Sequence, residues 1–98
     1  MSSEDLGFLR TLESTIANRL EKPSPNSYTS SLVAQGPKRV AQKVGEEGVE
    51  LALAAAGGDR DEIINETADL LYHTLVLLRS HGIELSNVIA RLEGRHRA

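Results

Sequence analysis

The sequence contains no cysteine and no tryptophan. Apart from histidine, its aromatic residues are two tyrosines and one phenylalanine. Disulfide bonds and thiolate metal sites are therefore excluded, because both need cysteine. The apolar residues are mostly leucine, isoleucine, valine and alanine, which suit helix-on-helix packing better than the core of a β-sandwich. This composition favours an all-α protein.

The chain also lacks any apolar run that approaches the ~20 residues needed to cross a membrane. Its first residues, MSSEDLGF, are acidic where a secretory signal would be basic. We therefore expect a cytoplasmic protein with no membrane partner. The net charge of −3 argues against nucleic acid as the main partner. An anionic substrate is still compatible with it, because a bound metal ion can reverse the local field.

The length of 98 residues suits a single domain, and residues 1–98 contain no internal repeat and no low-complexity tract. A chain of this size buries only about 60–65% of the surface that its unfolded form exposes. Its stability alone is therefore marginal, and association with a second copy would help.

Helical spacing of apolar residues, together with proline and glycine positions, predicts four or five helices and no strand. They cover approximately residues 3–22, 37–56, 60–80 and 85–92, with a short one within residues 27–36. Pro37 suits a first helical position, and Gly57 and Gly58 end that helix. Asp59 has the place of an N-cap, with Glu62 three residues later as in a capping box. Short connections predict antiparallel neighbours, and the basic tail EGRHRA is expected to fray.

Four carboxylates lie at mirror-image positions around the two-glycine turn. Glu50 lies eight residues before Gly58, and Glu66 lies eight residues after it. Glu47 lies eleven residues before the same glycine, and Asp69 lies eleven after it. In an antiparallel hairpin these pairs are at matching heights, roughly 12 Å and 16 Å from the turn at ~1.5 Å per residue. Because the two acids of each helix are three residues apart and share a face, the hairpin can bring all four together.

Most clusters of charged residues are a solvated helix face, but this cluster fits that interpretation poorly. Two unit charges about 5 Å apart repel by about 3 kcal/mol at an effective dielectric of about 20. Lys43 is the one counter-charge on the acidic stripe. The second helix of the hairpin has two apolar stripes, one of Ile64, Leu71, Leu75 and Leu78 and one of Ile63, Leu70 and Leu77. Such a helix is wedged between neighbours, which places its acids in a cleft. Oxygen ligands of this kind predict a Mg²⁺ site.

Other catalytic motifs are absent: the sequence has no phosphate-binding P-loop, no zinc-protease motif and no nucleophile elbow. His73 and Lys43 continue the mirror symmetry. Because Mg²⁺ prefers oxygen ligands, we expect His73 to have a structural role or to contact the metal ligands, rather than to bind the metal itself. Lys38, Arg39 and Lys43 share one end of their helix and could reach a phosphate, although each alone is more often a surface charge.

The acidic residues form an EEGVE segment and an ETAD segment, which are separated by fifteen residues. This E-E-x-x-E and E-x-x-D pair resembles the signature of the all-α nucleoside triphosphate pyrophosphohydrolases, the MazG-like superfamily. The surroundings, SYTSSLVAQGPKRVAQKVGEEGVE and ETADLLYHTLVLL, are similar to the phosphoribosyl-ATP pyrophosphohydrolases of histidine biosynthesis. The resemblance covers nearly the whole chain.

The resemblance implies Mg²⁺-dependent hydrolysis of the α–β phosphate bond of phosphoribosyl-ATP, which yields phosphoribosyl-AMP and pyrophosphate. It also implies a homodimer, in which two hairpins would form a four-helix core. The metal ligands carried over from the family are Glu47, Glu50, Glu66 and Asp69. The catalytic carboxylates would be Glu46 and Glu47, with Glu46 positioning or deprotonating water. The substrate-binding residues would be Lys43, Lys38 and Arg39 for phosphate, and Tyr28, Thr29 and His73 for other parts of the molecule.

Two other functions stay open on the sequence alone. One is a house-cleaning pyrophosphatase of the same superfamily, which would act on dCTP, dUTP or damaged nucleotides with the same carboxylates. The other is a non-catalytic helical interaction module, whose acidic cleft would bind Mg²⁺ or a basic partner.

Overall fold

The structure, a computed structural model, describes residues 3–97, and all secondary structure in that range is helical. The helices are α1 (Ser3–Glu21), α2 (Tyr28–Ala34), α3 (Pro37–Gly57), α4 (Arg60–Ser80) and α5 (Leu85–His96). The predicted all-α class is confirmed, and α2 is the short helix expected between the first two long ones. Over the residues described, no helix combines the length and the apolar character needed to cross a membrane.

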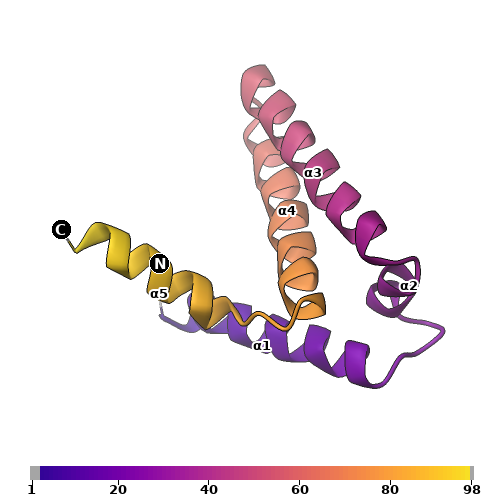
Figure 1. Ribbon diagram of the computed structural model, residues 1–98. Coiled ribbons are helices and arrows are strands. Elements are labelled where there is room, and N and C mark those ends of the chain that lie inside the picture. The colour runs from indigo at the N-terminus through magenta and orange to yellow at the C-terminus, as the bar shows by residue number, and fades with distance from the viewer. Residues whose placement is uncertain (1–2, 98) are drawn as a thin grey trace.

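The helices α3 and α4 form an antiparallel hairpin that stands on α1 (Figure 1). Gly58 ends α3 in the left-handed conformation, with φ of 80°, and its N–H bonds to carbonyl oxygens in the last turn of that helix. The Asp59 side chain then accepts hydrogen bonds from the N–H groups of Asp61 and Glu62 and so begins α4. The predicted turn and N-cap are both confirmed. A connection this short fixes which residues of the two helices face each other.

The core lies at the base of the hairpin, where four helices meet. Its buried residues are Ile16 of α1, Leu32 of α2, Val40 of α3, and Leu75 and Val76 of α4. Glu47 lies two turns beyond Val40 along α3, and His73 lies less than one turn before Val76 along α4. The acidic residues of the hairpin therefore begin directly above the core.

The upper part of the hairpin is less covered than its two apolar stripes predict. Leu75 is buried, but Leu71 and Ile64, on the same stripe of α4, are each 49% exposed. On α3, Val49 and Leu53 are exposed as well. The helix α4 does pack between α3 and α1 at its base, as expected, but its upper outer stripe has no neighbour within the described residues of the single chain.

The helix α5 leads away from the base of the hairpin (Figure 1), and its first residue, Leu85, donates a backbone hydrogen bond to Glu13 of α1. The helix continues to His96, so residues 93–96 of the tail that was expected to fray are helical, and Ala98 lies outside the described residues. His96 bonds through Nδ1 to the Leu92 carbonyl oxygen, and Arg97 pairs with Glu93. Basic residues in a last helical turn are also favoured by the helix dipole. The Cα radius of gyration, 14.7 Å, exceeds the ~13 Å typical of a compact domain of this length.

Replacing the N-cap of α4 tests how the hairpin is held. Asp59→Ala leaves two N–H groups of α4 without a partner, and we expect the free energy of unfolding to fall by about 1 kcal/mol. Urea denaturation of the two proteins measures this difference. Asp59→Asn, which keeps a side-chain oxygen at the same place, serves as the control and should stay close to the unsubstituted protein. Equal stability of Asp59→Ala would contradict the role of the cap.

Candidate functional site

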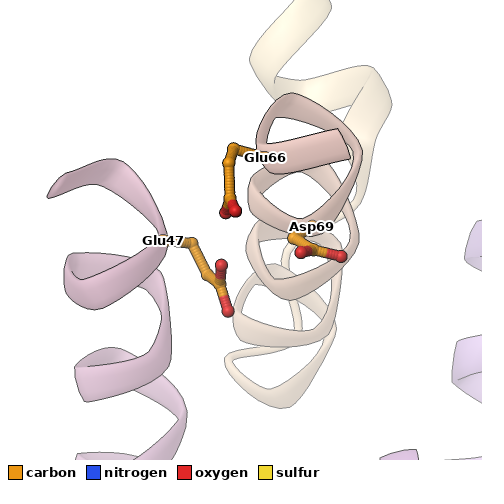
Figure 2. A group of neighbouring side chains, drawn as sticks. All are labelled: Glu47, Glu66 and Asp69. Atoms are coloured by element: carbon orange, nitrogen blue, oxygen red, sulfur yellow. The ribbon is translucent and has the colours of Figure 1, made fainter. Parts of the chain in front are cut away.

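Three carboxylates converge in the upper half of the α3–α4 hairpin. Glu47 of α3 and Glu66 and Asp69 of α4 each offer one oxygen, and these three oxygens lie within 4.8 Å of one another. Figure 2 shows Glu47 reaching from α3 towards α4, where Glu66 and Asp69 project from successive turns. We call these three residues the carboxylate triad. Its members come from the mirror-image positions around Gly58, as the sequence spacing predicts.

Two oxygens of the carboxylate triad lack a hydrogen-bond partner. Glu47 is only 5% exposed, and its Oε2 atom and the Oε2 atom of Glu66 are buried and unbonded within the described residues. A buried polar atom left unpaired costs about 1–3 kcal/mol, and more when the group is charged. A hard divalent cation would supply the missing partner, since its preferred ligands are carboxylate oxygens. The donor set of the triad therefore fits such an ion, and exposed Asp69 leaves one side open to solvent.

Glu50, predicted as a fourth ligand, lies beside the triad rather than within it. A hydrogen bond with Glu66 raises the pKa of Glu50, and the negative charges of Glu47 and Glu66 raise it further. These neighbours show that Glu50 and Glu66 lie at the same height of the hairpin. A pKa raised in this direction is expected where like-charged carboxylates lie close together.

Two residues contact Glu47 on the side towards the core. The Nζ atom of Lys43 lies 3.2 Å from Glu47 Oε1, and the Nδ1 atom of His73 lies 3.8 Å from the same oxygen. The hydrogen bond to Glu47 is the largest effect that raises the pKa of Lys43, so this ammonium group stays charged beside the triad. His73 itself is 6% exposed and lies outside the ligand cluster.

The other charged residues predicted for the site, Arg39, Glu46 and Lys38, do not contact the triad in the described residues. Arg39 Nη1 and Glu46 Oε1 form an ion pair of 3.3 Å between partly exposed side chains. Because neighbouring residues of a helix point about 100° apart, Glu46 lies off the face of α3 that carries Glu47. Lys38 is exposed in the first turn of α3. Of the three basic candidates, Lys43 is therefore the one in contact with the triad.

The first turn of α2 joins the site from the other side. Tyr28 is 53% exposed, and its hydroxyl lies 2.9 Å from Nε2 of His73. Thr29 is 7% exposed, and its hydroxyl is hydrogen-bonded to that of Tyr72. Tyr28 can therefore reach a bound molecule, whereas Thr29 is enclosed. Tyr72 is not among the predicted site residues, and only its place directly before His73 in the sequence indicates that it adjoins the site.

The sequence was compared with those of known proteins and protein families. The sequence model of the family described as "Phosphoribosyl-ATP pyrophosphohydrolase" matches residues 9–96, a range that contains the triad, Tyr28 and His73.

Relatives named "Histidine biosynthesis bifunctional protein HisIE" are about half identical to the chain. The protein of Photobacterium profundum is 54% identical over 91 residues, which make up 93% of this chain and 44% of that protein. The protein of Vibrio cholerae is 53% identical over 90 residues, 92% of this chain and 43% of its own length. The protein of Yersinia pestis is 52% identical over 95 residues, 97% of this chain and 47% of its own length.

The chain thus spans less than half the length of these curated relatives while matching them over nearly all of its own. The match to the family covers α1 from residue 9 onwards, the whole of α3, α4 and α5, and both acidic segments. The fold is all-helical and gathers acidic residues of both segments on one hairpin. By its sequence, the chain belongs to the phosphoribosyl-ATP pyrophosphohydrolase family.

Proposed function

We propose that the chain hydrolyses the α–β phosphate bond of phosphoribosyl-ATP, releasing pyrophosphate and phosphoribosyl-AMP, as a step of histidine biosynthesis. The observation that carries this proposal is the carboxylate triad with its two buried, unpartnered oxygens, in a member of this family. The printed names of the relatives, which refer to histidine biosynthesis, support the pathway.

We further propose Mg²⁺ as the ion of the triad, with Glu50 as an additional ligand. Mg²⁺ held there would offset the charge of the triphosphate and of the leaving pyrophosphate. The protein's own contribution is to hold the carboxylates in place, because Glu47 Oε1 is anchored by Lys43 while Glu47 Oε2 is left free. Exposed Asp69 and Glu50 form the open side through which a phosphate can approach.

Lys43 is the residue best placed to bind a phosphate oxygen. Its ammonium group is held beside the triad by one contact to Glu47, and it has further N–H donors for charge-assisted hydrogen bonds. For Arg39 to bind phosphate, or Glu46 to act on water, the ion pair between them would have to open. Both side chains are partly exposed, so this pair is weak enough to be exchanged.

We also propose that two copies of the chain associate through the outer stripe of α4. Ile64 and Leu71 continue the stripe on which Leu75 is buried, and both are half exposed. On a helical wheel they lie about 180° from His73 and so face away from α3. Pairing this face of two hairpins would create a four-helix core and cover apolar surface that α1 leaves open.

Addition of Mg²⁺ should stabilise the protein, because the ion relieves repulsion within the triad. At a concentration about 100 times its dissociation constant it should add ~2.7 kcal/mol, which raises the melting temperature by roughly 10 °C or more. Glu66→Gln should lose most of this increase, whereas Glu62→Gln, an exposed acid of the same helix, should keep it. Thermal melts with and without Mg²⁺ measure the response, and an equal response of both variants would contradict the ion site.

Asp69→Asn should abolish turnover without unfolding the chain. Loss of a metal-binding carboxylate is expected to lower the rate by at least about 100-fold, since even groups that only support a ligand cost about 10- to 100-fold. Pyrophosphate release from phosphoribosyl-ATP with Mg²⁺ and helicity by circular dichroism are measured on the same sample. Asp61→Asn, in the exposed first turn of α4, is the control and should stay active. Near-full activity of Asp69→Asn, or its unfolding, would contradict the assignment.

The same assay separates the competing functions when ATP and dCTP are run in parallel. Release from phosphoribosyl-ATP alone is the expected outcome. Release from dCTP instead would retain the chemistry of the triad but move the protein to nucleotide-pool cleaning. No release from any of the three would overturn the proposed activity in favour of a binding module.

Leu71→Asp should separate the proposed dimer into monomers, because it places a charge in the middle of the α4 contact. Sedimentation velocity measures the oligomeric state of each variant over a range of protein concentrations. Leu53→Asp is the matched control, since Leu53 is exposed on α3 and lies outside the proposed contact. Dissociation of the Leu53 variant, with an intact Leu71 variant, would contradict the choice of face.

A further inference from the structure

The helix α5 carries an apolar face that the single chain does not cover. Ile83, just before the helix, and Val88 and Leu92 within it line one open groove, which we call the α5 groove. Leu92 is 45% exposed, and no residue of α5 is buried in the described part of the chain. An apolar surface of this kind on an otherwise polar helix is typical of a contact with another molecule.

The α5 groove begins where the outer stripe of α4 ends. The backbone N–H of Ile83 donates a hydrogen bond of 2.9 Å to the carbonyl oxygen of Leu78, the last residue of that stripe. Figure 1 shows α5 leaving the base of α4 on the side opposite α3. Ile64 and Leu71 of the stripe also face away from α3. The stripe and the groove therefore border one angle between α4 and α5.

The two ends of the angle carry opposite charges. Arg91 and Arg95 line the α5 groove, and neither forms a hydrogen bond or an ion pair with another described residue. The hairpin tip, residues 58–62, has three carboxylates and one arginine. Of these carboxylates, Asp61 lies three residues before Ile64 and so on the same side of α4. The tip of one copy is therefore complementary in charge to the α5 groove of another.

The spacing of the α4 stripe suits an antiparallel contact between two copies. Leu71 lies seven residues from both Ile64 and Leu78, about 10 Å along the helix in either direction. With a two-fold axis at Leu71, Ile64 of one copy faces Leu78 of the other, and the hairpin tip beyond Ile64 reaches the other copy's α5. The symmetry repeats this contact at both ends. Parallel pairing would instead bring the two acidic tips together and leave both grooves open.

We propose that the α5 groove is the docking site for the hairpin tip of a second copy of this chain, in an antiparallel dimer whose Arg91 and Arg95 face Asp61 of the other copy. This inference rests on the α4 contact proposed above and is independent of the proposed reaction. The α4 stripe presents only two large half-exposed residues, Ile64 and Leu71. Because stable interfaces bury about 1,200–2,000 Å² in total, the two grooves add apolar surface that such a dimer needs.

The first test places a charge in the α5 groove of the full chain. Leu92→Asp should raise the dissociation constant of the dimer about tenfold or more, because the carboxylate would be buried against apolar groups. Ala90→Asp is the matched control: Ala90 is exposed and lies about 200° from Leu92 around the helix, so its dimer should be unchanged. Sedimentation velocity over a range of concentrations measures both, and circular dichroism checks that α5 is retained. An intact Leu92→Asp dimer, where Leu71→Asp dissociates, would overturn the α5 contact and leave the α4 contact standing.

The second test exchanges charges between the tip and the groove. Arg95→Glu should weaken the dimer about fivefold, since it replaces attraction to Asp61 of the other copy by repulsion. Adding Asp61→Lys to the same chain should restore the original affinity. Arg97→Glu, on the opposite side of α5, makes the same change of charge and should leave the dimer unchanged. An Arg95→Glu dimer as tight as the original, or no recovery in the double variant, would overturn the pairing of tip and groove.

The third test reads the orientation of the two copies without altering the groove. The sequence has no cysteine, so Glu62→Cys provides a single site for a spin label. Glu62 lies nine residues from Leu71, which separates the two labels by about 27 Å in height in the antiparallel dimer and not at all in a parallel one. Electron-spin distance measurement should give at least this separation, and a shorter distance would overturn the proposal. A chain that is monomeric at all concentrations would overturn both contacts, whereas loss of pyrophosphate release alone would overturn only the proposed reaction.

Discussion

Repulsion between carboxylates across the α3–α4 hairpin is the interaction on which the rest of the structure depends. Glu47, Glu66 and Asp69 meet within 4.8 Å, and two of their oxygens are buried without a hydrogen-bond partner. Neighbouring unit charges in such a place oppose folding by several kcal/mol in total. The two-residue turn at Gly58 and Asp59 and the core at the base of the hairpin keep the helices together against this repulsion. A cation bound between the carboxylates would relieve this repulsion, so the repulsion would add to its binding energy.

The polar groups around the triad limit how its members can relax. Lys43 holds one oxygen of Glu47, and His73 bonds to the backbone of α4 at Asp69 and to Tyr28 at the start of α2. These contacts join α2, α3 and α4 at one level directly above the apolar core. The free oxygens of the triad are consequently directed between the helices instead of turning to solvent. A site prepared in this way loses little conformational entropy when an ion binds.

Much of this arrangement is predictable because it follows from spacing along the chain. Gly58 and Asp59 signal the turn through their local backbone chemistry, and the mirror-image positions of Glu47 and Asp69 follow once the turn is known. Contacts that depend on how separate helices meet are not predictable in this way. The bond between Thr29 and Tyr72 joins residues 43 positions apart, and no local pattern indicates it. The exposure of Leu71 depends on where α1 crosses the hairpin, which periodicity alone does not show.

The measurement that tests the central claim most directly is the position of a bound ion. Crystals grown with Mn²⁺, which shares the preference of Mg²⁺ for carboxylate oxygens, would be analysed for anomalous scattering. The account predicts a peak between α3 and α4 within coordination distance of Glu47, Glu66 and Asp69. A peak elsewhere, or a triad that remains metal-free at saturating Mn²⁺, would contradict it.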